Sequence, residues 1–187
     1  MELIGLYLVA CGLLVAAGLA KAVRPDDTAR ALATALRLRR RTARTLVRVG
    51  SVLEVALGAI ALVLPRPWWA TLVALSYVAF AGFVAYARST GGAIASCGCF
   101  GTPDTPATLV HIVVNAVLAL SAVAVAVAAP SGTLVTVLAR QPGHGVPLVA
   151  VSALAGWLIY LAVSVLAALQ AARALTDVSF DRPGTAS

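Results

Sequence analysis

The sequence predicts an all-α protein, a polytopic bundle of transmembrane helices, because of its composition and its five long apolar runs. Of the 187 residues, 61% are hydrophobic and 11% are charged, whereas soluble domains are about half apolar and about a quarter charged. Each run approaches the roughly 20 residues that a helix needs to cross a bilayer. None alternates apolar and polar residues as a barrel strand does. The predicted spans are 3–23, 46–64, 68–87, 109–129 and 146–169.

The first of these runs is expected to remain in the mature protein. Only Met1 and Glu2 precede it, whereas a secretory signal peptide begins with a basic segment and has a shorter apolar run. The longest polar stretch, 24–48, is too short to bury a core of its own. We therefore expect one membrane domain without a separate soluble domain.

The stretch 24–48, which leads into the second span, is strongly basic and is predicted to form an interfacial helix. Pro25, Asp26 and Asp27 provide a helix start. Alanines and leucines then alternate with arginines, which is typical of a helix at the level of the lipid headgroups. The net charge of +7 is therefore expected to serve contact with anionic lipid. Nucleic acid is not expected as a partner, because the arginines are not interleaved with aromatic or polar residues that could read bases.

The basic residues also predict how the chain is oriented. With five spans, twelve of the fourteen lysines and arginines fall on one side of the membrane and two on the other. The positive-inside rule then places 24–48, the loop 88–108 and the carboxyl-terminal tail in the cytoplasm, and the amino terminus outside.

The second span contains an ionisable residue, Glu54, with Gly50 and Gly58 four residues to either side. The three share a helix face, on which glycines let a neighbouring helix approach the carboxylate. A charge at this depth costs about 2.5–3.5 kcal/mol on insertion scales and is by default a functional candidate. A structural acid that ties two helices together is the alternative.

The fourth span carries His111 and Asn115, again four residues apart and in the same half of the membrane as Glu54. Both are candidate site residues. The alternatives are a headgroup-level histidine and an asparagine that hydrogen-bonds between helices. Cys11, near the middle of the first span, is expected to pack as a small apolar residue, with a redox role left open.

The loop 88–108, between the third and fourth spans, holds the most informative motif, Cys97-Gly98-Cys99. A disulfide across one residue is strained and exchange-prone, and closing so small a ring adds little stability. The pair is therefore predicted to be redox-active and not a structural bridge. Alternatively, Cys97 and Cys99 with His111 suit Cu(I) or Zn(II), although a structural zinc site usually has a fourth ligand.

These motifs together resemble the MauE family of methylamine-utilisation membrane proteins, which are related to DoxX. The resemblance covers about residues 1–129, and it implies a four-helix membrane unit similar to vitamin K epoxide reductase and DsbB. The loop and fifth span, 130–169, and a polar tail, 170–187, which is expected to be disordered, lie outside it. The residues that carry the resemblance are Gly18-Leu19-Ala20-Lys21, Glu54 with Gly58, Asn115 and, most specifically, Cys97-Gly98-Cys99-Phe100-Gly101.

The resemblance also implies a function. A member of this family is expected to be a thiol–disulfide oxidoreductase of the cell membrane that exchanges electrons with a thioredoxin-fold, MauD-like partner. This exchange would support the maturation of methylamine dehydrogenase. The catalytic pair would be Cys97 and Cys99. Supporting polar residues would favour a thiolate, relay protons or orient a quinone, the candidate cofactor. These supporting residues are Lys21, Glu54, His111 and Asn115.

The chain departs from the resemblance in two respects. Vitamin K epoxide reductase and DsbB use a Cys-x-x-Cys pair and a second loop pair, whereas this chain has three cysteines in all, so a relay through two internal disulfides is not available. The resemblance also implies a cysteine loop outside the cytoplasm, opposite to the charge count, and both orientations stay open. Two other hypotheses remain: a noncatalytic assembly subunit and a Cu(I)-handling membrane protein.

Overall fold

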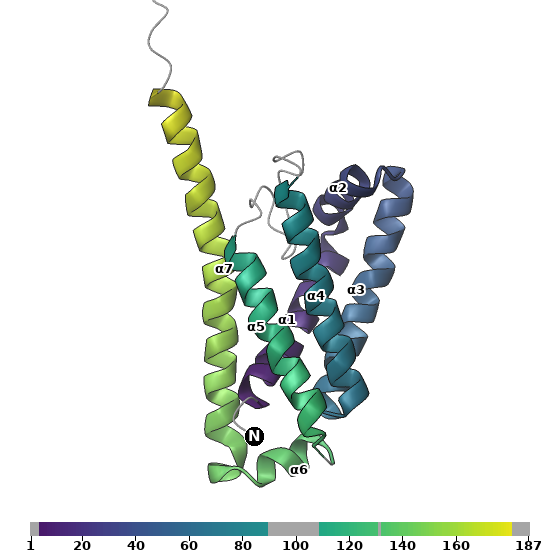
Figure 1. The fold of residues 1–187 in the computed structure, drawn as a ribbon, viewed down its shortest axis with the longest axis vertical. Helices are drawn as coiled ribbons and strands as arrows, with labels where there is room; N and C mark the ends of the chain where they lie inside the picture. Colours follow the sequence, from purple (N-terminus) through teal and green to yellow (C-terminus); the bar gives the residue numbers. More distant parts are fainter. Residues whose placement is uncertain (1–3, 90–108, 131, 181–187) are drawn as a thin grey trace, which may run out of the picture.

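The computed structural model describes residues 4–89, 109–130 and 132–180, and all regular elements within them are helical (Figure 1). This confirms the all-α prediction. Five helical segments, α1, α3, α4, α5 and Pro142–Ala162, are long and apolar enough to cross a membrane, which indicates a multi-pass membrane protein. The elements are α1 (Ile4–Val23), α2 (Pro25–Leu36), α3 (Arg40–Val63), α4 (Pro67–Ser89), α5 (Leu109–Ala128), α6 (Leu134–Ala139), the 3-10 turn η1 (Pro142–Gly145) and α7 (Val146–Phe180).

The five predicted spans coincide with five of these helices, but two helices run further than expected. Helix α3 begins at Arg40, well before residue 46, and α7 continues to Phe180. The tail was expected to be disordered from residue 170, whereas its first part belongs to this long helix, which projects past the end of the bundle (Figure 1).

The basic stretch 24–48 also differs from the prediction, because it is not one helix. Helix α2 ends at Leu36. The next residue, Arg37, has a left-handed φ of 51°, and the Leu38 amide closes the helix end by donating to Ala33 O at 3.0 Å. The chain then reverses into α3. The reversal lets Ala29 of α2 pack against buried Ala43 of α3, whereas a straight helix would leave that apolar face uncovered.

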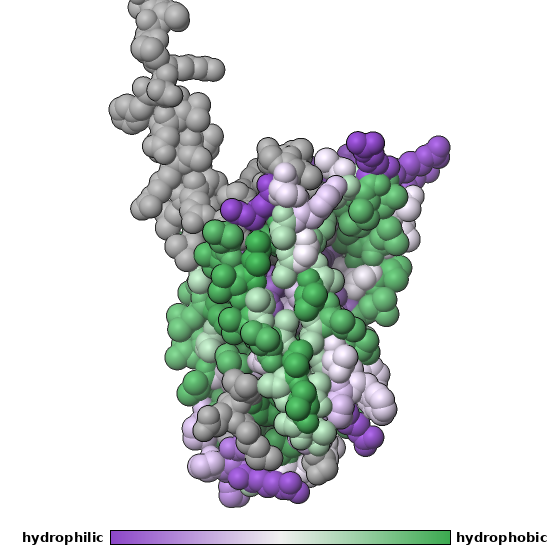
Figure 2. Space-filling model, viewed as in Figure 1, coloured by the Kyte–Doolittle hydropathy of each residue, from purple (hydrophilic) through white to green (hydrophobic). Residues whose placement is uncertain are grey.

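Helix α1 lies in the core of the bundle, packed against α3, α5 and α7, while α4 packs on α5. Two buried tyrosines hydrogen-bond to backbone carbonyls of neighbouring helices. Tyr7 Oη donates to Ala61 O at 3.2 Å, and Tyr77 Oη donates to Ala10 O at 2.6 Å. On the face of the molecule shown in Figure 2, hydrophobic surface covers the middle and hydrophilic residues lie toward both ends.

Two glycines bring α1 and α3 into backbone contact. A Cβ added to Gly18 would lie 2.9 Å from Ser51 O, and one added to Gly58 would lie 2.9 Å from Cys11 O. The helices are therefore antiparallel and in close contact at two points. Gly58 behaves as predicted, but Gly50 does not, because nothing lies within 4 Å of a Cβ added there.

Candidate functional site

The candidate site is built around Lys21, which lies in the last turn of α1, one turn beyond Gly18. This lysine is only 6% exposed. Since Gly18 holds this end of α1 against α3, the lysine side chain meets residues of the neighbouring helices, and its ammonium group is kept inside the bundle.

The ammonium group of Lys21 forms an ion pair with Glu54 of α3. Nζ lies 2.7 Å from Oε1, to which it donates a hydrogen bond, and 2.6 Å from Oε2. The same nitrogen sits 4.5 Å from the centre of the Phe80 ring of α4, a cation–π contact. The pair thus connects α1, α3 and α4, and each charge compensates the burial cost of the other.

One carboxylate oxygen of Glu54 remains incompletely satisfied. Oε2 is buried and, among the described residues, has no hydrogen-bond partner, because its 2.6 Å contact with Nζ lies outside hydrogen-bond geometry. A buried acceptor of this kind is costly. The contact with the Lys21 ammonium group is therefore the main compensation for this oxygen inside the bundle.

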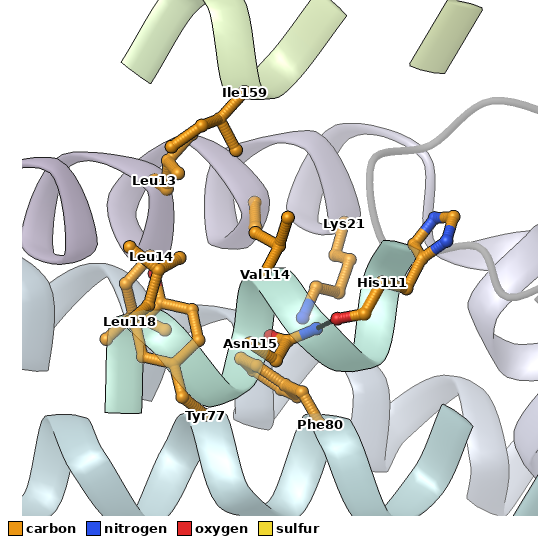
Figure 3. A pocket seen from close by; sticks show the side chains of 11 residues that line it. Leu13, Leu14, Lys21, Tyr77, Phe80, His111, Val114, Asn115, Leu118 and Ile159 are labelled. Carbon is orange, nitrogen blue, oxygen red and sulfur yellow. Dashed lines mark hydrogen bonds between the residues drawn. The ribbon is translucent and has the colours of Figure 1, made fainter. Parts of the chain in front are cut away.

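A small cavity lies beside Lys21 (Figure 3). It has a volume of about 40 Å³ and is lined from four helices, α1, α4, α5 and α7. In Figure 3, Lys21 reaches into it beside Asn115 and Phe80. The full lining comprises Leu13, Leu14, Ala17, Lys21, Tyr77, Phe80, His111, Val114, Asn115, Leu118 and Ile159.

The volume of this cavity limits what it can hold. A buried water needs about 10–15 Å³, whereas a cavity that binds benzene measures about 150 Å³. At about 40 Å³, this one is suited to a few water molecules and does not fit a quinone ring. Among the described residues, the ones that the sequence suggested for orienting a quinone therefore do not line a cavity of that size.

His111 and Asn115 line the cavity from the first two turns of α5. Asn115 Nδ2 donates to His111 O at 2.6 Å, a bond within α5. His111 is buried, with 4% exposure, in the first turn of α5. The structure thus brings together three of the four supporting residues around one cavity, and the fourth, Glu54, through the ion pair with Lys21.

Sequence reasoning missed the apolar part of the site. Phe80 and Tyr77 of α4 line the cavity, and Ile159 of α7 contributes from the fifth span. A phenylalanine or isoleucine in an apolar run carries no signal of its own, so these could be found only from the packing. Cys97 and Cys99 lie outside the described residues; their segment, 90–108, is joined to Ser89 of α4 and Leu109 of α5.

Cys11 occupies a packing position away from the cavity lining. It is fully buried, and its backbone carbonyl lies against Gly58. This agrees with the expectation of a small apolar residue. Among the described residues, no three His, Cys, Asp or Glu side chains lie close enough to hold a metal ion; a site formed by Cys97, Cys99 and His111 is not tested by this.

Comparison with known families gives one match. A family model described as methylamine utilisation protein MauE matches residues 2–129. The matched part contains every polar residue of the site, while Ile159 of α7 lies beyond it. Comparisons with curated proteins and with solved structures give no significant match.

Proposed function

The chain belongs to the family of methylamine utilisation proteins MauE, and on that premise we propose that it is an integral membrane thiol–disulfide oxidoreductase. Cys97 and Cys99 exchange electrons with a thioredoxin-fold partner. Family membership implies a role in methylamine utilisation, and the exchange would support the maturation of a partner enzyme in that process.

The observation that carries this proposal is the position of the buried polar site relative to the cysteine segment. Lys21 lies at the carboxyl end of α1, and His111 lies in the first turn of α5, directly after segment 90–108. The segment leaves α4 at Ser89, on the same end of the bundle. The two residues that flank the cysteine segment, Ser89 and Leu109, thus lie at the end of the membrane domain that holds the buried polar residues.

The proposed reaction is a two-step exchange that balances without a further reactant. A thiolate of the partner's reduced dithiol attacks one sulfur of the Cys97–Cys99 disulfide, so that this bond breaks and a mixed disulfide forms. The partner's second thiolate then breaks the mixed disulfide. Two electrons and two protons pass from the partner to the pair, which ends as two thiols, and the partner ends as a disulfide.

The ion pair supports this chemistry as a positioning device. Because Glu54 is the direct ion-pair partner of Lys21, the two side chains together carry no net charge with which to favour a thiolate. Instead, the pair holds the last turn of α1 against α3 and α4, and water held in the small cavity beside it would relay protons.

A trapping experiment tests the proposal. With Cys99→Ser the exchange is tested in reverse: the Cys97 thiolate attacks the disulfide of the oxidised partner, and no second thiolate on this chain can release the partner. A mixed disulfide with a thioredoxin-fold protein should therefore accumulate under mild oxidation and be identifiable by mass spectrometry. Cys11→Ala is the matched control, because this buried cysteine should leave the cycle intact. The redox function is wrong if neither Cys97 nor Cys99 changes its reactivity toward a thiol-specific label when the protein is oxidised and then reduced.

A second candidate is a noncatalytic assembly subunit that binds and positions a partner enzyme. It is favoured by the ion pair and the Asn115–His111 bond, which join polar groups of the bundle to each other and suit a structural role equally well. Replacing both Cys97 and Cys99 by serine separates the two functions. A scaffold should still support the maturation of the partner enzyme in this variant, whereas a redox protein should no longer do so. Metal analysis of the reduced protein tests the remaining Cu(I) hypothesis.

A further inference from the structure

We infer that the exposed arginines of α2 and the start of α3 form a binding surface for the headgroups of anionic phospholipids. This goes beyond the redox function and does not depend on it. We call this surface the basic patch. All of its members are exposed, and they lie at the hydrophilic α2 end of the molecule in Figure 2. They are Arg24, Arg30, Arg37, Arg39, Arg40, Arg41, Arg44 and Arg48.

The charge of the basic patch is only partly compensated within the chain. Arg30 pairs with Asp27, and Arg44 Nε lies 3.3 Å from Asp26 Oδ1. The other six arginines have no acidic partner in the described part of the chain. Like charges this close repel one another, so the surface is complementary to a layer of negative charge outside the protein.

The packing of α1 on α3 sets the depth of the basic patch. Since Gly18 lies against Ser51 and Val55 on the antiparallel helix, Arg24, six residues further along the chain, lies at about the level of Arg48 on α3. Lys21 is three residues closer to the middle of α1, about 5 Å deeper at 1.5 Å per residue. The arginines thus border the apolar spans, which is the level of the lipid phosphates.

Exposed apolar side chains beside the arginines distinguish a lipid surface from an acidic protein. Val23, Leu36, Leu46 and Val49 are 77%, 57%, 49% and 54% exposed. Helix α2 meanwhile buries Ala29 and Ala31 against the bundle. Apolar side chains next to arginines match the boundary between acyl chains and headgroups, where both kinds of residue are stabilised.

The test uses the purified full-length protein in a neutral detergent, titrated with phosphatidylglycerol or phosphatidylcholine, with bound lipid counted by native mass spectrometry. We expect phosphatidylglycerol to bind more tightly. Arg40→Gln with Arg41→Gln should weaken its binding about 30-fold, because each basic residue near an anionic surface contributes about a factor of five. The matched control, Arg66→Gln with Arg140→Gln, removes two exposed arginines at the opposite end and should leave binding unchanged.

A second variant keeps the test independent of folding. Arg40→Lys with Arg41→Lys retains the charge and should keep the affinity within about fivefold of the native value. The inference is overturned if both lipids bind equally, or if the two glutamine variants weaken binding to the same extent. It is also overturned if sodium phosphate displaces the lipid at equal phosphate concentration, because the surface would then be a site for free phosphate.

Discussion

Replacing Lys21 by methionine tests how strongly the bundle depends on its buried ion pair. Lys21 Nζ lies 2.7 and 2.6 Å from the two Glu54 oxygens, and the two side chains are 8% and 16% exposed. Methionine keeps most of the apolar stem but leaves the carboxylate buried without a counter-charge. Removing one partner of a buried pair costs about 3–5 kcal/mol, and we expect about 3 kcal/mol because Glu54 retains some exposure.

Reversible unfolding in mixed micelles, by titration with sodium dodecyl sulfate and far-UV circular dichroism, measures this change. Arg30→Met is the matched control, since it breaks an ion pair whose arginine is 58% exposed, and such pairs contribute about 0.2–1 kcal/mol. Adding Glu54→Met to Lys21→Met should restore most of the stability, because no uncompensated charge remains. The reasoning is refuted if Lys21→Met costs no more than Arg30→Met, or if the double variant is as unstable as the single one.

The same titration checks two further expectations. Gly18→Ala and Gly58→Ala should each lower the free energy of unfolding by about 1–3 kcal/mol through overpacking. Each added Cβ would lie 2.8 Å from a valine side chain and 2.9 Å from a carbonyl oxygen of the facing helix. Gly50→Ala is the control and should not destabilise the protein, because nothing lies within 4 Å of a Cβ added there. Tyr77→Phe should cost about 0.5–1.5 kcal/mol, because it removes a buried hydrogen bond to the Ala10 carbonyl, which keeps its backbone bond within α1. The exposed hydroxyl of Ser76 gives the control, and Ser76→Ala should have little effect.

The spans could be predicted from the sequence because bilayer thickness imposes a length and a composition on each one. The break between α2 and α3, within residues 24–48, could not be predicted. Helices commonly end at a left-handed glycine, whereas here the left-handed residue is Arg37, so no glycine or proline marks the turn. The reversal is instead stabilised by packing between Ala29 and Ala43, a contact that exists only in the folded bundle.

The four buried polar residues around the cavity could be named from the sequence, but the pairing of two of them could not. Lys21 and Glu54 were both identified, but their side chains were assigned separate roles, since a sequence does not state which turns of two helices face each other. Phe80 and the cavity follow from that same packing. The cysteine pair, the most specific motif, lies outside the described residues, so its role stays a prediction.

The glycine contacts and the ion pair form one register device between α1 and α3. Gly18 precedes Lys21 by three residues, and Glu54 precedes Gly58 by four, so each charge lies about one turn from a glycine. The two glycine contacts fix the helices along their axes, and the charges then meet at 2.6 Å. A slip of one residue would rotate one charge by about 100° around its helix and separate the pair in a low-dielectric interior. The ion pair therefore penalises every other register, which explains why a costly charge in a membrane span accompanies glycines at this spacing.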